Sequence, residues 1–379
     1  MGQLTERIDR FLADRTPPTP LLVLDLNIVC TQYRALRTCL PFADVYYAVK
    51  ANPALEVIGV LAELGASFDL ASCGELKRCR DGNVSADRVS FGNTIKREAD
   101  IAQASAEGVR LFAFDSLGEL EKLARAAPGA RVFCRMLARS KGAEWPLTHK
   151  FGCDAEMATD LLIRAKALGL RPAGVSFHVG SQQTDPLQWN SPIEHAEKVF
   201  RSCARAGVEL DLLNLGGGLP ARYRFEVPSL ESYAQAIDGA LDEHFGSSRP
   251  RIIIEPGRYL VGDAAVLRAQ VLLVSHKSRH ASKRWVYVDA GRYNGLTETF
   301  GERIQYRLRT SRDGTMCSPV ILAGPTCDSA DIIYEKSGYE LPLDLGVGDT
   351  IDFLSAGAYT ASCASVEFNG FAPIQTYCI

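Results

Sequence analysis

One lysine, Lys50, stands where an apolar segment of the chain ends, and it is the residue best placed for covalent chemistry. The residues before it, Tyr46–Val49, are of the buried strand-forming type, and Asn52-Pro53 cannot continue a strand. A strand would deliver the amine to the mouth of the scaffold, where partial desolvation lowers its pKa and frees it to form imines. The alternative is a lysine that ends a strand in solvent, and only the rest of a site can decide between the two.

Three other motifs carry side chains or backbone groups that could hold a ligand. Gly216-Gly217-Gly218 exposes backbone N–H groups to an anion, although a glycine run can also be a tight turn. Ser176–Ser181 contains the imidazole of His178 and ends with a hydroxyl, and a histidine there can be purely structural. In Glu255-Pro256-Gly257-Arg258-Tyr259 an acid and a base lie three residues apart, which can be no more than a local ion pair.

Short β-branched and aromatic runs recur through the first two thirds of the chain and alternate with segments of helical period. The runs are Val45–Lys50, Ser67–Ala71, Val89–Gly92, Leu111–Asp115, Arg131–Arg135, Gly174–Val179, Leu212–Leu215 and Ile252–Glu255. The helical segments include Ala54–Gly65, Arg97–Gly108, Ser116–Ala127, Asp154–Gly169, Pro192–Gly207 and Leu230–Phe245. Eight such strands predict a parallel sheet closed into a (β/α)8 TIM-like barrel, with an open doubly wound sheet as the alternative.

Residues able to do chemistry gather at the carboxyl ends of these runs. They are Lys50, Asp69, Asn93, Asp115, Arg135, His178, Gly216-Gly217-Gly218 and Glu255. Any one of them alone is more often structural, but eight together are hard to explain by core packing. Because barrel enzymes build their active sites at this rim, the pattern favours the barrel and predicts a site there.

The pattern changes after Tyr259. Four strand-like segments, Val266–His276, Arg284–Asp289, Pro319–Leu322 and Thr350–Leu354, have few helical segments between them and predict a mainly antiparallel β domain. We expect the N-terminus to join this domain, because Pro17-Pro18-Thr19-Pro20 separates it from the barrel. The expected limits are 25–260 for the barrel and 1–24 with 261–379 for the β domain.

Composition narrows the class of protein. The 379 residues are 46% apolar and 23% charged, with a net charge of −3, which is typical of a globular protein and gives no reason to expect nucleic acid or an anionic membrane as a partner. No apolar run approaches the roughly 18 residues of a membrane span, and the first residues lack signal-peptide features. The eleven cysteines show no zinc-type spacing, so we expect no metal and a reducing, cytoplasmic location.

Taken in order, the motifs resemble those of the pyridoxal-phosphate decarboxylases of the alanine-racemase-like barrel class, which act on ornithine, lysine and diaminopimelate. The matching segments are Tyr47–Asn52, Phe177–Ser181, Gly216–Gly218, Glu255–Tyr259, Gly324–Asp328 and Gly357–Thr360. The resemblance extends from about Leu21 to Phe371. It implies a barrel enzyme that uses pyridoxal 5'-phosphate.

The resemblance also implies a role for each site residue. Lys50 would hold the cofactor as a Schiff base, Glu255 would pair with its pyridine nitrogen, and His178 would stack on its ring. Asp69 and Arg135 would order the lysine and its surroundings. The phosphate would be held by Ser181, Gly217, Gly218, Gly257, Arg258 and Tyr359.

Within the family, Thr326-Cys327-Asp328 resembles the ornithine/lysine branch. In that branch the cysteine reprotonates the α-carbon after CO2 leaves and the aspartate binds the distal amine. We expect Tyr293 and Glu302 to complete the substrate site. Diaminopimelate decarboxylases usually have Cys-Glu here and a serine in place of Tyr259. The family's cysteine motif enters the active site of the neighbouring subunit, which implies a homodimer with shared sites.

One departure leaves the substrate open. Bacterial relatives commonly have Glu-Thr-x-Asp-Glu where this chain has Glu298-Thr299-Phe300-Gly301-Glu302, so Gly301 removes one carboxylate. The expected reaction is decarboxylation of ornithine or lysine to a diamine. The alternatives are a modified or D-configured basic amino acid, or diaminopimelate. A racemase is disfavoured by the cysteine motif. From another class, an inactive homologue that binds protein partners would typically have lost the lysine or the cysteine.

Overall fold

The computed structural model describes residues 6–138, 141–145, 150–365 and 367–379. The chain forms two compact units. The barrel unit consists of Cys30–Pro220 and Val227–Tyr259, and the β unit of Met1–Val29, Ala221–Glu226 and Leu260–Ile379. The domain limits expected from the sequence were 25–260 for the barrel and 1–24 with 261–379 for the β domain, and they remain predictions.

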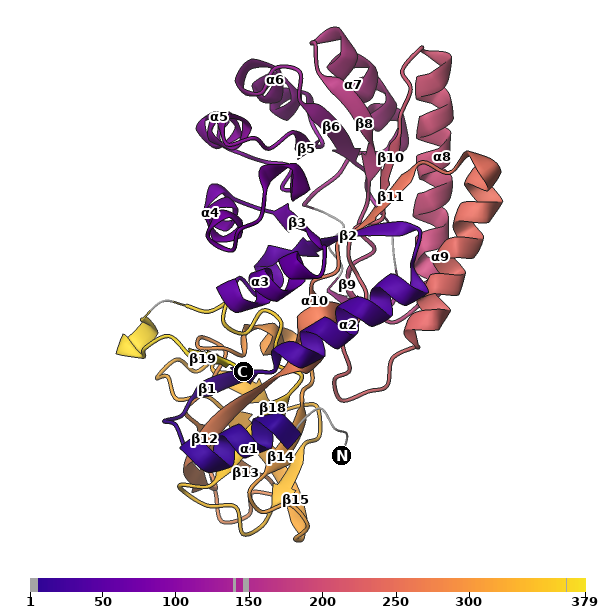
Figure 1. Cartoon of the computed structure of the whole chain (residues 1–379). Helices are drawn as coiled ribbons and strands as arrows, with labels where there is room; N and C mark the ends of the chain where they lie inside the picture. The colour runs from indigo at the N-terminus through magenta and orange to yellow at the C-terminus, as the bar shows by residue number, and fades with distance from the viewer. Residues whose placement is uncertain (1–5, 139–140, 146–149, 366) are drawn as a thin grey trace. The chain divides into compact units, whose positions relative to one another are not determined.

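The barrel unit is built on a closed parallel barrel (Figure 1). In its described part, eight strands pair in the order β10-β11-β2-β3-β4-β5-β6-β8, which confirms the predicted fold. The strands are β2 (Ala43–Ala48), β3 (Ser67–Leu70), β4 (Val89–Phe91), β5 (Leu111–Phe114), β6 (Arg131–Arg135), β8 (Arg171–Ser176), β10 (Leu212–Asn214) and β11 (Arg251–Ile254). The short strands β7 (Ala143–Trp145) and β9 (Ser181–Gln183) form a separate antiparallel pair.

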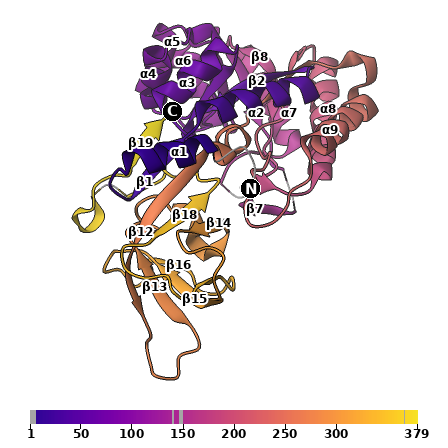
Figure 2. The same cartoon turned by 60° about the horizontal axis from the view of Figure 1, so that its bottom comes forward.

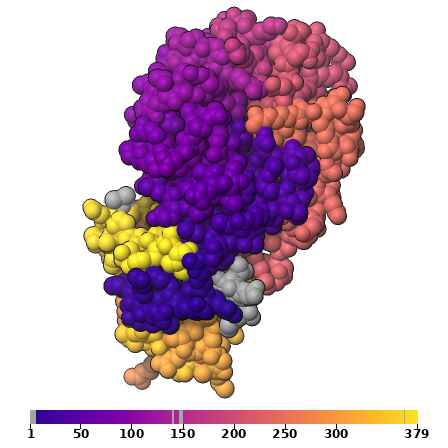
Figure 3. Space-filling model, in the orientation of Figure 1, coloured from indigo at the N-terminus to yellow at the C-terminus, as the bar shows by residue number. Residues whose placement is uncertain are grey.

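Helices cover the outside of the barrel, and Figure 3 shows the packed surface that they form. The α-helices of this part of the chain are α2 (Leu26–Cys39), α3 (Leu55–Glu63), α4 (Cys73–Asp81), α5 (Glu98–Ala106), α6 (Leu117–Ala126), α7 (Ala155–Ala167), α8 (Asn190–Arg205), α9 (Leu230–Phe245) and α10 (Arg258–Val261). Sequence analysis missed α4, because only Leu76 and Cys79 of its residues are buried and two apolar positions make a weak helical pattern. None of the helices in the described residues is long and apolar enough to cross a membrane.

Apolar side chains fill the barrel interior. A buried cluster draws on several strands and comprises Tyr46, Leu111, Ala113, Phe133, Ala173, Leu212 and Ile253. Because this cluster closes the middle of the barrel, polar side chains are accommodated beyond the strand ends, as is usual for barrels of eight strands.

The β unit is a mostly antiparallel sheet, as predicted. Nine strands pair among its described residues, with β13 beside β15 and β1 beside β19 as the parallel pairs. Figure 2 shows β1 and β19, from opposite ends of the chain, side by side. The strands are β1 (Leu21–Leu24), β12 (Ala265–Ser275), β13 (Arg284–Val288), β14 (Arg307–Thr310), β15 (Cys317–Ala323), β16 (Ile332–Tyr334), β17 (Glu340–Pro342), β18 (Thr350–Leu354) and β19 (Gln375–Cys378).

The helix α1 (Glu6–Arg15) packs on this sheet. Its buried residues Ile8 and Leu12 lie against Leu21, Val23 and Val266. Three of the strands that sequence analysis missed are very short or only partly buried: β14 has no fully buried residue, and β16 and β17 each contain three residues. Such segments carry too few apolar positions for an alternating pattern to be recognised.

Candidate active site

Lys50 lies on a single 3-10 turn, η1 (Val49–Ala51), which follows β2. This corrects the expectation that the strand itself extends to the lysine. The turn packs against the loop after β11: the Ala48 N–H donates to the Pro256 carbonyl (3.2 Å), and a Cβ on Gly257 would lie 2.8 Å from the Cβ of Ala51. The Lys50 side chain is exposed in this chain, so the barrel unit alone does not desolvate it as the sequence suggested.

Glu255 follows β11 and is held by a residue that sequence analysis missed. Asn214, the last residue of β10, is 1% exposed, and its side-chain N–H donates to the Glu255 carboxylate. The Asn214 side-chain oxygen accepts from the Gly216 N–H (2.9 Å). One buried amide therefore connects the carboxylate to the glycine loop and fixes both, because a buried polar group has few other partners.

The glycine loop lies close to the backbone and side chains around it. A Cβ on Gly216, whose φ is +64°, would lie 2.0 Å from the Phe177 carbonyl oxygen. At Gly217 a Cβ would lie 2.8 Å from the Glu255 carbonyl oxygen and 3.1 Å from Nε2 of His178. Only glycine fits here, and the loop lies directly beside the imidazole, as the glycine loops of anion sites lie close to their ligands.

The His178 ring is partly buried and oriented by its own loop. Its Nδ1 accepts a hydrogen bond from the Gly180 N–H (3.0 Å), which places the proton of the neutral ring on Nε2. Desolvation, with the positive charges of Arg135 and Lys50 adding to it, holds the pKa of His178 well below its ordinary value. The ring is therefore neutral at pH 7, which suits contact with a flat ring.

Ser181 and Arg258 meet on the same rim. The Arg258 guanidinium, 3% exposed, donates to the Ser181 hydroxyl oxygen from Nε (3.3 Å) and Nη2 (3.1 Å). Arg258 is the first residue of α10, directly after Gly257. A guanidinium and a hydroxyl on the rim that also carries the glycine loop are donors suited to a phosphate.

Asp69, the third residue of β3, is a buried carboxylate, 6% exposed. It accepts from the Ser90 hydroxyl (3.0 Å), and the absence of a side chain at Gly92 makes room for it, because a Cβ there would lie 2.0 Å from its Oδ1. Desolvation and then the charge of Glu255 raise the pKa of Asp69 well above its ordinary value, against the opposing effect of Lys50. The charges of Glu255 and Lys50 therefore both act on the Asp69 carboxylate.

Arg135 ends β6, with its guanidinium carbon 5.1 Å from the centre of the Phe151 ring. The loop that carries Phe151 is held by Asp115, whose carboxylate accepts from the Gly152 N–H (2.8 Å). The positive charge of Arg135 acts on Asp69 and on His178, so it belongs to the same rim. All the predicted barrel-unit site residues thus lie at or just beyond the carboxyl ends of strands.

The β unit carries the other predicted site residues. The Tyr293 hydroxyl donates to the Asp328 carboxylate (3.1 Å), which also accepts from the Ala330 N–H (2.8 Å). Cys327 precedes Asp328 and is exposed. Tyr359 is partly buried and adopts a positive φ of 61°, in the Gly357–Thr360 segment. Tyr293, Cys327 and Asp328 therefore form one cluster within the β unit.

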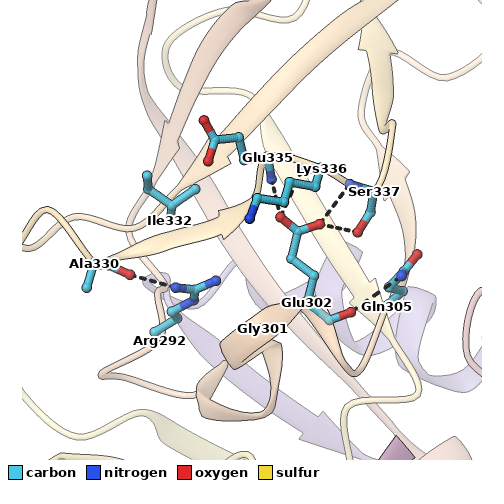
Figure 4. A pocket seen from close by; sticks show the side chains of 9 residues that line it. All are labelled: Arg292, Gly301, Glu302, Gln305, Ala330, Ile332, Glu335, Lys336 and Ser337. Atoms are coloured by element: carbon cyan, nitrogen blue, oxygen red, sulfur yellow. Dashed lines mark hydrogen bonds between the residues drawn. The ribbon is translucent and has the colours of Figure 1, made fainter.

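Glu302 has a different environment from the one expected. Its carboxylate accepts the backbone N–H groups of Glu335 (2.8 Å), Lys336 (2.8 Å) and Ser337 (2.7 Å), and also the Ser337 hydroxyl (Figure 4). Burial raises its pKa, but these hydrogen bonds outweigh burial and the pKa is lowered overall. Through these hydrogen bonds Glu302 stabilises the loop that follows β16. Its role in binding substrate stays a prediction.

Gly301 precedes Glu302, and both residues line a cavity of about 520 Å³ (Figure 4). The cavity lies within the β unit, and its other lining residues are Arg292, Gln305, Ala330, Ile332, Glu335, Lys336 and Ser337. Gly301 has a φ of +64°, and a Cβ there would approach only the Arg303 side chain, at 3.9 and 4.0 Å. A side chain at this position has room but a strained backbone.

The barrel rim fits pyridoxal phosphate. The glycine loop, Ser181 and Arg258 provide donors for a phosphate, a cradle that any larger side chain at Gly217 would fill. The neutral ring of His178 borders it, and Glu255 and Lys50 follow neighbouring strands, β11 and β2. Fold and cradle together define a barrel enzyme with a site for this cofactor.

Comparison with known proteins identifies the family. The family described as "Pyridoxal-dependent decarboxylase, pyridoxal binding domain" matches residues 26–262. The lysine/ornithine decarboxylase of Selenomonas ruminantium is 34% identical, covering 97% of this chain and 91% of that protein. The solved lysine/ornithine decarboxylase of Vibrio vulnificus, complexed with cadaverine, has a TM-score of 0.88 at 33% identity, covering 98% and 97% of the two chains.

The family also includes a relative that is not named as an enzyme. Antizyme inhibitor 2 of Xenopus laevis is 34% identical, covering 97% of this chain and 82% of that protein.

The chain belongs to the pyridoxal-phosphate-dependent decarboxylase family, and it is a pyridoxal-phosphate-dependent amino-acid decarboxylase.

Proposed function

We propose that this enzyme decarboxylates a basic amino acid of the ornithine or lysine type, releasing CO2 and a diamine. The observation that carries this proposal is the Tyr293–Asp328 hydrogen bond directly beside Cys327, since it sets a carboxylate for an ammonium group next to a proton donor. The names of the relatives, which are lysine/ornithine decarboxylases, support the same class of substrate.

Each site residue has a chemical task in this proposal. When bound, pyridoxal phosphate supplies the electron sink for the electron pair that departing CO2 leaves behind. Lys50 would hold the cofactor covalently through Nζ, and Glu255 would keep a proton on its pyridine nitrogen. His178 would contact the cofactor, and Asp69 and Arg135 would set the charge around the lysine. The phosphate would be held by Ser181, Gly217, Gly218, Gly257, Arg258 and Tyr359.

Cys327 and Asp328 act at the other end of the substrate. The Cys327 thiol gives its proton to the α-carbon, and Asp328 pairs with the distal ammonium group. The family resemblance supports a homodimer in which these two residues serve the partner subunit's barrel. A cytoplasmic location stays a prediction from the cysteine content.

Replacing Asp328 by alanine tests the distal contact. We expect kcat/KM for lysine or ornithine to fall by roughly 10²-fold, mostly through KM, because the ammonium group loses its carboxylate in a partly buried pocket. An analogue without the distal amine, such as norleucine, should be affected little. The control Tyr293→Phe removes only the hydroxyl and should have a smaller effect. Equal losses for lysine and norleucine would argue that Asp328 does not bind the ammonium group.

Replacing Gly301 by aspartate tests which basic amino acid is the natural substrate. CO2 release is measured for ornithine, lysine, arginine, diaminopimelate and the D-enantiomers. If the glycine adapts the site to another substrate, Gly301→Asp should shift the ratio of kcat/KM values toward ornithine and lysine by roughly three- to tenfold, the effect of one partly screened charge. Gly301→Asn is the matched control, since asparagine tolerates a positive φ and carries no charge.

Two outcomes of that panel count against parts of the proposal. If the wild type prefers ornithine and Gly301→Asp changes nothing, the glycine has no role in specificity. If purified wild-type protein loaded with the cofactor releases no CO2 from any of these amino acids, the substrate class is wrong. The alternative of a non-catalytic protein, represented in the family by a relative named as an inhibitor of antizyme, would then be favoured.

A further inference from the structure

A turn near the C-terminus holds the two loops that carry Tyr293 and Cys327. Its Ser365 N–H donates to the Tyr293 carbonyl (2.8 Å). The Phe368 ring stacks on the Tyr293 ring, with centroids 4.5 Å apart and an interplanar angle of 30°. The next residue, Asn369, reaches Cys327. Ser365, Phe368 and Asn369 are therefore part of this cluster, although no sequence motif pointed to them.

Asn369 contacts Cys327 through one atom. Its side-chain oxygen accepts from the Cys327 backbone N–H (3.2 Å) and from the Cys327 thiol (Sγ–Oδ1 3.5 Å). The backbone of Asn369 is left-handed, with φ of 54° and ψ of 20°, a conformation that asparagine adopts more readily than other residues with side chains. Asn369 thus places a hydrogen-bond acceptor on the sulfur.

An amide oxygen beside a thiol has a definite chemical effect. It stabilises the protonated form, which donates to it, and disfavours the thiolate, which would face its lone pairs. It also fixes the rotation of the S–H group, while the backbone bond fixes the residue that carries it. The two hydrogen bonds thus fix where the proton of the thiol points.

We propose that Asn369 is a positioning residue for Cys327, holding the thiol in one orientation. This inference rests on the proposed function, in which that thiol gives its proton to the α-carbon. In that step the S–H bond breaks and a C–H bond forms, and the thiolate regains its proton from water. Asn369 acts on this step through the sulfur and does not itself contact the substrate.

The test measures the alkylation of Cys327 by iodoacetamide as a function of pH, with the cofactor-loaded enzyme and mass spectrometry of the peptide that contains Cys327. Because the thiolate is the reacting form, the rate at pH 7 follows the thiolate fraction. Asn369→Gly removes the acceptor and keeps the backbone conformation, and it should react about threefold faster. Asn369→Asp keeps the shape and adds a negative charge, and it should react about tenfold slower.

The opposite signs separate positioning from a merely structural role. Glu367→Gln removes an exposed charge from the same turn and should leave the rate within about twofold of the wild type. Loss of structure would move both Asn369 variants in the same direction. Equal shifts in one direction, or no shift in either variant, would overturn the proposal.

Steady-state kinetics distinguish this inference from the proposed function. Asn369→Gly should lower kcat by about tenfold or more with little change in KM, since it weakens a proton transfer and not binding. If Cys327→Ala retains wild-type CO2 release and product, the role of Cys327 as a proton donor fails. The alkylation rates would still show whether Asn369 controls the thiol.

Discussion

Replacement of Lys50 by alanine should abolish CO2 release, lowering kcat by roughly 10⁴-fold or more. Among the described residues of the proposed site, Lys50 is the one whose side-chain amine can bind the cofactor covalently as an imine. Because Lys50 is exposed on a short turn, the barrel should still fold and bind phosphate through the glycine loop. The visible absorption of covalently bound cofactor should disappear.

Lys50→Arg is the matched control for charge. It retains the positive charge that acts on Asp69 and His178 but offers no neutral amine, so it should be as inactive as the alanine variant. Lys77→Ala, on the outer helix α4, should remain fully active. Turnover by Lys50→Ala above a few per cent of wild type would refute the assignment of the lysine.

Mixing two inactive variants should restore activity if the sites are shared between subunits. Lys50→Ala and Cys327→Ala proteins, exchanged at equal amounts, give mixed dimers in about half of the population. In such a dimer one site carries both lesions and the other carries none. We therefore expect about one quarter of wild-type activity to return.

A second mixture provides the control for this experiment. His178 and Lys50 both belong to the barrel unit, so in a mixture of His178→Ala with Lys50→Ala each site of a mixed dimer keeps one lesion. That mixture should stay inactive. Recovery in neither mixture, once subunit exchange is demonstrated by mass spectrometry, would mean that Cys327 serves the barrel of its own chain.

Much of the barrel could be predicted from local pattern. Its strands are largely buried, so most of them are short apolar runs, interrupted by a few polar residues, of the kind that sequence analysis recognises. Arg131–Arg135 was predicted with the observed limits, and the other seven runs overlap the observed strands. The order of motifs along the chain was enough to predict the family and the cofactor, both of which the comparisons confirm.

The residues that hold the predicted site in place had no such signal. Asn214 and Ser90 are single polar residues inside buried strands, and nothing in their neighbours marks them as partners of Glu255 and Asp69. The same holds for Asn369, which lies 42 residues from Cys327 in the sequence. Hydrogen bonds between such distant residues depend on how strands and loops pack, and a local pattern does not record that.

By itself, therefore, the sequence determined the barrel, the β domain and the cofactor, because each of these follows from local composition or from ordered motifs, and it predicted which side chains react. Only the tertiary structure decided the environment of each side chain. It placed Lys50, itself exposed, on a short turn after β2 and joined Asn214 to Glu255. It also brought the Glu302 carboxylate into hydrogen bonds with three backbone N–H groups that lie more than thirty residues away in the sequence. Burial and hydrogen bonding arise between segments remote in the chain, so they are set when those segments pack together.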